Sequence, residues 1–271
     1  MATLYFLKNN SAVQMLGLVL VTDTKTVVID GGTVEDASAL LPYITKNGRP
    51  HVDAWYFTHP HHDHIGAFVA LCEAQPTLTV GRLFCRFPTV EARLASAPRN
   101  AREVTLWTAM EELLSDRFAA AVCRPQELSR EVYDDVTVTV VRTYSECITD
   151  DLINNSSMVL RIDGPTKSAL ILGDLGEAGG DDVLRRFPIS LLQTDYTQMA
   201  HHGQNGVRRD FYETVRPRAC LWPSPDWLWD NDEGRGFDTG RFNTVRTREW
   251  MDALGVREHY VEKDGPHAIE L

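Results

Sequence analysis

Five metal-capable side chains lie within six residues, in the stretch His59-Pro60-His61-His62-Asp63-His64. Residues Ala54 to Thr58 are mostly apolar or aromatic and predict a buried strand, whereas Ile65 to Cys72 predict the first turns of a helix. The histidines therefore fall in the turn at the carboxyl end of a strand, where α/β proteins place ligand sites. Imidazole and carboxylate groups together suit zinc, iron or manganese. A purification tag would be neither internal nor interrupted by Asp, so the pattern predicts a metal site.

The tight turn can aim alternate residues at two points. His59 and His61 could hold one ion, and Asp63 and His64 a second. Further candidates follow two later strands: Asp174 comes after Ala169 to Gly173, and His201 and His202 come after Tyr196 to Ala200. From the residues alone, Asp174 could instead cap a following helix, and the two histidines could be structural.

Four segments resemble one family, in the family's order: Val28-Ile29-Asp30-Gly31-Gly32, Thr58 to Gly66, Ile171-Leu172-Gly173-Asp174 and Met199-Ala200-His201-His202-Gly203. The chain is similar to the metallo-β-lactamase-fold hydrolases. Asn154-Asn155-Ser156-Ser157 extends the resemblance to the branch that contains the hydrolase domain of competence DNA-uptake channel proteins. The resemblance implies a four-layer αβ/βα sandwich, an α/β fold, over residues 1–271 as a single domain, with a mainly helical insertion at residues 88–130.

The resemblance also assigns roles. Asp174 would bridge two cations, and His201, as the first residue after its strand, would complete the second site. His202 would then either support a ligand by a hydrogen bond or donate a proton. Asp63 would be a ligand, and either Asp63 or a metal-bound water would shuttle the proton. Asp30 would be structural and tie loops together beneath the metal site. The expected cofactor is Zn²⁺, as one or two ions, with Mn²⁺ or Fe as alternatives.

One position departs from the wider family, in which the segment around Asn155 supplies a third histidine to the first metal. Asn155 could instead give its carbonyl oxygen to the ion or hold a water. We expect the ion held by His59 and His61 to be bound more weakly for this reason.

The expected chemistry is hydrolysis by water whose pKa the metal lowers from about 15.7 towards 7. A phosphodiester or another small anionic substrate is favoured. A carbon ester, thioester, lactone or lactam is an alternative, and so is a non-catalytic metal-binding protein on the same fold. The chain contains neither Gly-x-Ser-x-Gly nor a phosphate-gripping Gly-x-x-x-x-Gly-Lys loop.

The composition of the chain limits which binding partners and which cellular compartment we expect. The net charge of −11 argues against broad nucleic-acid binding, although a local basic cleft remains compatible with it. Arginines 82, 86, 93, 99 and 102 could form an anion-recognising wall or a solvated helix face. The five cysteines are widely spaced, which predicts a reducing compartment, and with no signal sequence or membrane span we expect a cytoplasmic protein.

Two further segments leave alternatives open. The insertion at residues 88–130 carries apolar residues at helical spacing, and it could cover the site as a lid or form a homodimer surface. Trp222 to Trp229 contains three tryptophans and two prolines and predicts a stiff loop. This loop could pack over the end of the sandwich, stack on a substrate ring or contact another subunit.

Overall fold

The computed structural model describes residues 2–96 and 101–271. Its first sheet has the strand order β15-β1-β2-β3-β5-β6-β7, and a short β4 pairs with β5. Strands β3, β5, β6 and β7 run parallel to one another. The pairs β15·β1, β1·β2 and β2·β3 are antiparallel. The strands are β1 (Thr3–Phe6), β2 (Gly17–Val21), β3 (Thr26–Asp30), β4 (Thr45–Lys46), β5 (Arg49–Tyr56), β6 (Thr79–Phe84), β7 (Val122–Cys123) and β15 (His267–Glu270).

The second sheet has the order β14-β13-β12-β11-β10-β9-β8. Its strands β11 to β14 are parallel, and β8 to β11 form antiparallel pairs. The strands are β8 (Arg130–Tyr133), β9 (Val136–Arg142), β10 (Val159–Asp163), β11 (Ser168–Ile171), β12 (Tyr196–Gln198), β13 (Ala219–Trp222) and β14 (Glu258–Val261).

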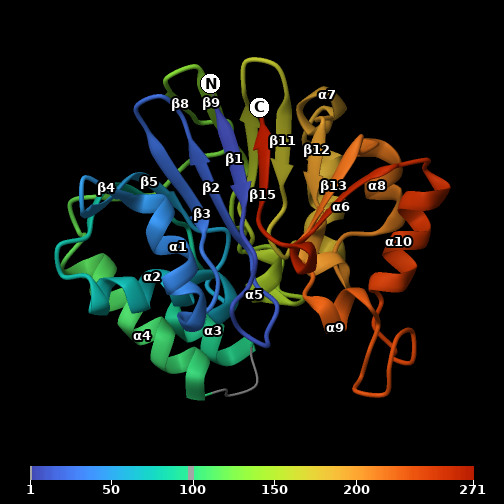
Figure 1. Cartoon of the computed structure of the whole chain (residues 1–271), viewed down its shortest axis with the longest axis horizontal. Helices are drawn as coiled ribbons and strands as arrows, with labels where there is room; N and C mark the ends of the chain where they lie inside the picture. Colours follow the sequence, from blue (N-terminus) through green and yellow to red (C-terminus); the bar gives the residue numbers. More distant parts are fainter. Residues whose placement is uncertain (1, 97–100) are drawn as a thin grey trace.

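Helices cover the outer face of each sheet (Figure 1). Over the first sheet lie α1 (Ala37–Ile44), α2 (His62–Ala74) and α4 (Ala101–Ser115), with α3 (Val90–Ser96) preceding α4. The second sheet is covered by α6 (Glu177–Arg186), α8 (Arg209–Val215) and α10 (Thr244–Ala253). Shorter elements are α5 (Leu152–Asn155), α7 (Ile189–Leu192), α9 (Asp226–Trp229) and the 3₁₀ turns η1 (Val34–Asp36), η2 (Ala200–Gly203) and η3 (Glu262–Asp264).

Three apolar cores account for the four layers. The central core joins the two sheets, with Ile29 and Tyr56 on one side and Leu160 and Ile171 on the other. A second core places Trp55 of β5 against the helices of the first half, and a third packs the outer face of the second sheet. Strand residues alternate between the central core and an outer core because successive side chains point to opposite faces. The predicted αβ/βα sandwich is confirmed.

The insertion is only partly as predicted. Residues 88–130 contain helices α3 and α4, but the segment ends with β7 and the start of β8, which extend one edge of each sheet. Arg99 lies outside the described residues. The tryptophan-rich segment is likewise not one loop, because Trp222 is a buried residue of β13 and Asp226–Trp229 form α9.

Candidate metal centre

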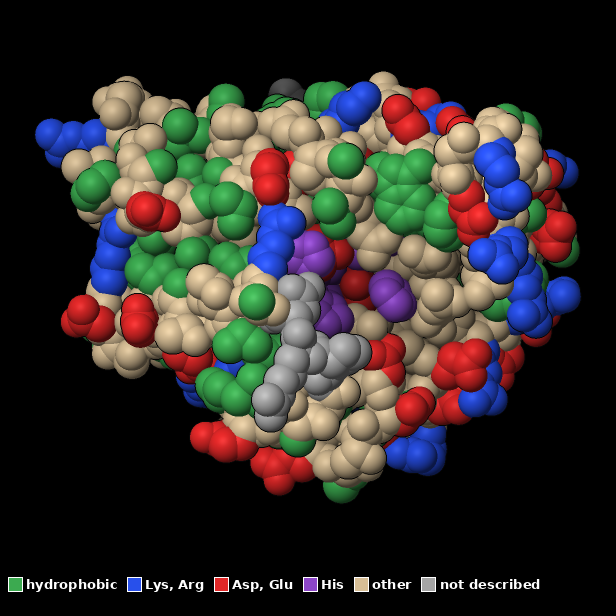
Figure 2. Space-filling view, turned by 90° about the horizontal axis from the view of Figure 1, so that it is seen from below, with side chains coloured by type: hydrophobic (Ala, Val, Ile, Leu, Met, Phe, Trp, Pro, Cys, Tyr) green, Lys and Arg blue, Asp and Glu red, His purple; other side chains and the backbone are tan. Residues whose placement is uncertain are grey.

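The parallel strands of both sheets bring polar side chains to one end of the sandwich. Asp30 ends β3, and the histidine-rich turn joins β5 to α2. From the second sheet, Asp174 follows β11 and His202 follows β12. Figure 2 shows histidine side chains, with acidic side chains among them, in a hollow of the surface. The candidate site is therefore assembled from both halves of the chain.

One group of donors consists of Asp63, His64, Asp174 and His202, all buried, with ligand atoms within 4.8 Å of one another. His202 Nε2 lies 3.2 Å from Oδ2 of Asp63 and 3.2 Å from Oδ2 of Asp174. His64 Nε2 lies 3.3 Å from Oδ1 of Asp174. Two imidazoles and two carboxylates thus converge on one small volume.

A second group, His59, His61 and Asp174, adjoins the first. His59 Nε2 is 3.0 Å from His61 Nδ1 and 3.7 Å from Asp174 Oδ2. Asp174 belongs to both groups, and this geometry supports the bridging role expected for it.

The donor atoms themselves test whether a cation fits. His64 Nε2, His202 Nε2 and Asp174 Oδ1 are buried, and none makes a hydrogen bond to any of the described residues. Buried polar atoms normally have partners, and leaving one without a partner costs about 1–3 kcal/mol. A divalent ion with nitrogen and oxygen ligands would satisfy all three, so the residues fit a metal.

Hydrogen bonds behind the donors fix the orientation of the rings. His64 Nδ1 donates to Asp30 Oδ2 at 2.8 Å, and His202 Nδ1 donates to the carbonyl of Pro223 at 3.0 Å. Each bond leaves the Nε2 lone pair free towards the cluster, as is usual for histidines that bind metals. Asp30 also accepts from the backbone N–H and the hydroxyl of Thr58, each at 2.7 Å. Its predicted structural role is confirmed.

Charge balance within the cluster comes from its own histidines. Burial opposes ionisation of Asp63, but His64 and His202 outweigh it and hold the pKa of this carboxyl well below its usual range. Burial likewise favours the neutral ring of His202, yet Asp174 and Asp63 raise the pKa of this imidazole to about 10. Because a ligating imidazole must be deprotonated, a metal that binds here would displace protons from the cluster.

The geometry favours the opposite assignment of His201 and His202 from the one that the sequence suggested. His202 lies within the buried cluster, whereas His201 is 19% exposed and its Nε2 is 3.9 Å from Asp174 Oδ2. Both residues have a left-handed backbone, with φ of 52° and 57°, which swings the second ring inward. His202 is therefore the better candidate ligand, and His201 lies at the rim.

The turn also explains Gly203. Its φ is +80°, and a Cβ atom there would lie 2.6 Å from the ring of Trp222. Glycine is needed both for the conformation and for the close approach. The structural role considered for Trp222 is thus supported, since its ring packs beneath the turn that carries His202.

Asn155 does not have the geometry expected of a ligand. Its Oδ1 accepts from the backbone N–H groups of Gly176 and Gly179, at 3.1 and 2.8 Å, and its Nδ2 donates to the carbonyl of Asp150. A carbonyl oxygen has two lone pairs, and both are used here. The neighbouring Ser157 contacts the site instead, because its hydroxyl is 3.3 Å from His59 Nδ1.

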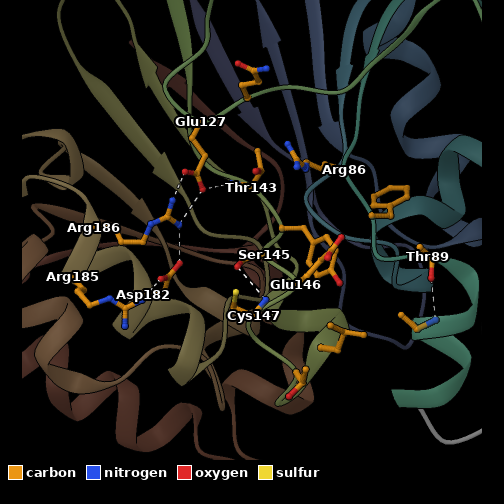
Figure 3. Close-up of a pocket in the computed structure, with 16 residues that line it drawn as sticks. Arg86, Thr89, Glu127, Thr143, Ser145, Glu146, Cys147, Asp182, Arg185 and Arg186 are labelled. Carbon is orange, nitrogen blue, oxygen red and sulfur yellow. Dashed lines mark hydrogen bonds and ion pairs between the residues drawn. The ribbon is translucent and has the colours of Figure 1, made fainter.

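Among the described residues, the arginines at 82, 86, 93 and 102 do not form one wall. Arg82 pairs with Glu131, buried Arg93 with Glu111, and Arg102 with Glu35. Arg86 lines an open cleft of about 1210 Å³, opposite the paired residues Asp182, Arg185 and Arg186 (Figure 3). No member of the two donor groups is among the described residues that line this cleft.

Sequence reasoning missed one pair at the site. His62 Nδ1 lies 2.5 Å from Oε1 of Glu103, a residue of helix α4. His62 was visible in the motif, but nothing in the sequence links it to a glutamate one helix away. The carboxylate and the hydrogen bond it accepts raise the pKa of His62.

Comparison with known proteins identifies the fold. A model of the metallo-β-lactamase superfamily matches residues 17–82, which contain the histidine-rich turn. This part of the chain is similar to the metallo-β-lactamase superfamily. The chain is 26% identical over 186 residues to ComE operon protein 3 of Bacillus subtilis (strain 168), an alignment that covers 67% of this chain. The match spans only 21% of that longer relative.

Solved structures share the architecture. The metallo-β-lactamase fold protein YhfI from Bacillus subtilis superposes with a TM-score of 0.60 at 12% identity, over 99% of this chain and 100% of that one. The diiron β-hydroxylase CmlA from Streptomyces venezuelae gives 0.55 at 12% identity, over 100% and 54%. A diphosphatase of the PhnP family gives 0.52 at 13% identity, over 100% and 98%. At these identities the likeness shows the fold alone. None of the helices in the described part of the chain is both long and apolar enough to span a membrane.

Proposed function

We propose that the chain is a single metal-dependent hydrolase domain. The observation that carries this proposal is the pair of donor groups that share Asp174, with three buried donor atoms that make no hydrogen bond to any of the described residues. We assign His59, His61 and Asp174 to one ion, and Asp63, His64, Asp174 and His202 to the other. Zinc suits these donors, and manganese or iron is compatible with them.

A cation bound there would supply Lewis acidity and lower the pKa of a water towards 7. Asp63 would take up the proton. The Oδ2 atom of Asp63 lies 3.2 Å from His202 Nε2, inside the cluster. Its Oδ1 atom lies 3.8 Å from Nδ1 of His62, a histidine that is partly exposed. His201, at the rim, is free of the cluster and can contact a substrate or its leaving group. Proton transfer by such groups contributes about 10²- to 10⁴-fold to a rate.

The preferred substrate class is a phosphodiester or another small anion. A cationic centre in a hollow attracts an anion, and the negative net charge of the chain disfavours long nucleic acids. The fold shared with a diphosphatase supports the same choice. We place the activity in a reducing, cytoplasmic setting, as the sequence predicts.

A substrate panel tests the proposal. Protein purified without a tag would be assayed, with added zinc, manganese or iron, on bis-para-nitrophenyl phosphate, a lactone, a thioester and nitrocefin. We expect turnover of the phosphodiester that a chelator abolishes. Turnover of a carbon ester or lactam alone would transfer the assignment to that class. Less than a tenth of an equivalent of metal after reconstitution would refute the metal site itself.

A further inference from the structure

The metal-binding turn contains two residues that are not candidate ligands, and both are held by the same helix. The candidate ligands are His59, His61, Asp63 and His64, so Pro60 and His62 are the intervening positions. Trp107 Nε1 donates to the carbonyl of Pro60 at 2.7 Å. Glu103 Oε1 lies 2.5 Å from Nδ1 of His62 and 3.4 Å from its backbone N–H.

Glu103 and Trp107 are four residues apart on α4, so they occupy one face of the helix, which packs on α2. Glu103 is 9% exposed and Trp107 2% exposed. The guanidinium of Arg93, from α3, lies 5.4 Å from the centre of the Trp107 ring. Both contacts are therefore made by well-packed side chains, and a rigid support of this kind transmits position to the groups it holds.

The two contacts hold the backbone at Pro60 and His62, the positions that lie between the candidate metal ligands. The bond to the carbonyl of Pro60 fixes the peptide that joins Pro60 to His61. The contact with His62 fixes the first residue of α2, immediately before Asp63. A carboxylate there also favours the helix, because the first N–H groups of a helix carry partial positive charge. We propose that α4 is a positioning element of the metal centre, with Glu103 and Trp107 as its positioning residues. This inference rests on the proposed metal site.

Three variants of the full chain test it. Glu103→Ala removes both contacts to His62, and Glu103→Gln keeps an oxygen that can accept from His62. Trp107→Phe keeps an aromatic ring and removes the donor to Pro60. Glu112→Ala is the matched control, because Glu112 is an exposed residue of the same helix. Circular dichroism would establish that each variant is folded.

The readouts are zinc affinity by chelator competition, the visible spectrum of the cobalt-substituted protein, and amide hydrogen exchange of residues 59–64 without metal. We expect Glu103→Ala to weaken zinc binding about 10- to 100-fold, the usual effect of losing a group that orients a ligand. Glu103→Gln should recover part of this loss, and Trp107→Phe should speed exchange in the turn. The control should match the native protein in all three measurements.

Two failures are distinguishable. If the native protein binds zinc and both Glu103→Ala and Trp107→Phe retain its affinity, cobalt spectrum and exchange rates, the positioning role is refuted and the metal site stands. If the native protein binds no metal, the proposed function fails. Hydrogen exchange in the turn then decides the positioning role, and unchanged exchange in both variants overturns it.

Discussion

Replacing Asp30 by Asn tests whether the support behind His64 matters to the site. The carboxylate accepts three buried hydrogen bonds, from the backbone and hydroxyl of Thr58 and from His64 Nδ1. A hydrogen bond to a charged group contributes about 1.5–3 kcal/mol. Removing all three, as in Asp30→Ala, would therefore cost a large part of the 5–15 kcal/mol that stabilises a typical domain.

Asn is the measurable change because it fits the same backbone, whose φ is 56° at this residue. Its oxygen can still accept from the N–H of Thr58, and the hydroxyl of Thr58 can rotate to accept from the amide. Only His64 Nδ1–H then faces a donor. We expect the free energy of unfolding of the metal-free protein to fall by about 1.5–3 kcal/mol, the value of one such bond.

Zinc affinity should fall as well, by about 10- to 100-fold, because His64 loses the group that orients its ring. Urea denaturation and chelator competition would measure the two effects. Asp53→Asn is a suitable control, since Asp53 accepts from Lys25 and from the backbone of Thr26, outside the candidate site. An Asp30→Asn protein with native stability and native zinc affinity would refute the reasoning.

Three further changes have defined outcomes. His202→Ala should lose bound metal while His201→Ala keeps most of it, as elemental analysis would show, and the reverse result would restore the order suggested by the sequence. Hydrogen bonds from Thr22 and Thr24 lower the pKa of Asp134 to about 2, so its contribution to stability should be complete above about pH 4 and be lost as the pH falls towards 2. Denaturation of native and Asp134→Asn protein across this range would show a difference that shrinks with acid, and a constant difference would contradict it. A thiol reagent should label exposed Cys147 first, since burial raises the pKa of Cys72 to about 12; rapid labelling of Cys147→Ser protein would count against this.

The sequence predicts the parts of the fold that depend on local pattern. The strand before His59 and the helix over Ile65 to Cys72 form where the apolar runs indicate, although β5 begins at Arg49 and α2 at His62, both earlier than predicted. Strand β13 was missed because Ala219–Trp222 is a short apolar run that merges with the tryptophan-rich segment. Strand β8 was missed because its pairing with β9 at a sheet edge is a long-range contact with little local signal.

Within the candidate site, the sequence identified which residues take part, but it did not predict which way their side chains point. Two consecutive left-handed residues decide that His202 rather than His201 turns inward, and such a turn has no pattern at the level of residue types. Asn155 was predicted to contact the metal or a water, but the oxygen of its side-chain amide instead accepts hydrogen bonds from the start of α6. Glu103 could not be found, because helix packing alone brings it to His62.

The donors of the candidate site come from both halves of the sandwich, and this links ligand binding to assembly. An ion that binds only when the two sheets are joined adds its binding free energy to the stability of their interface, by about 4 kcal/mol when it is present at a thousand times its dissociation constant. Asp63 and Asp174 would otherwise hold two negative charges at the interface between the halves, balanced by protons on neighbouring histidine rings. A bound metal would then link the two halves across their interface. Removing it with a chelator should destabilise the contact between the halves before it destabilises either half.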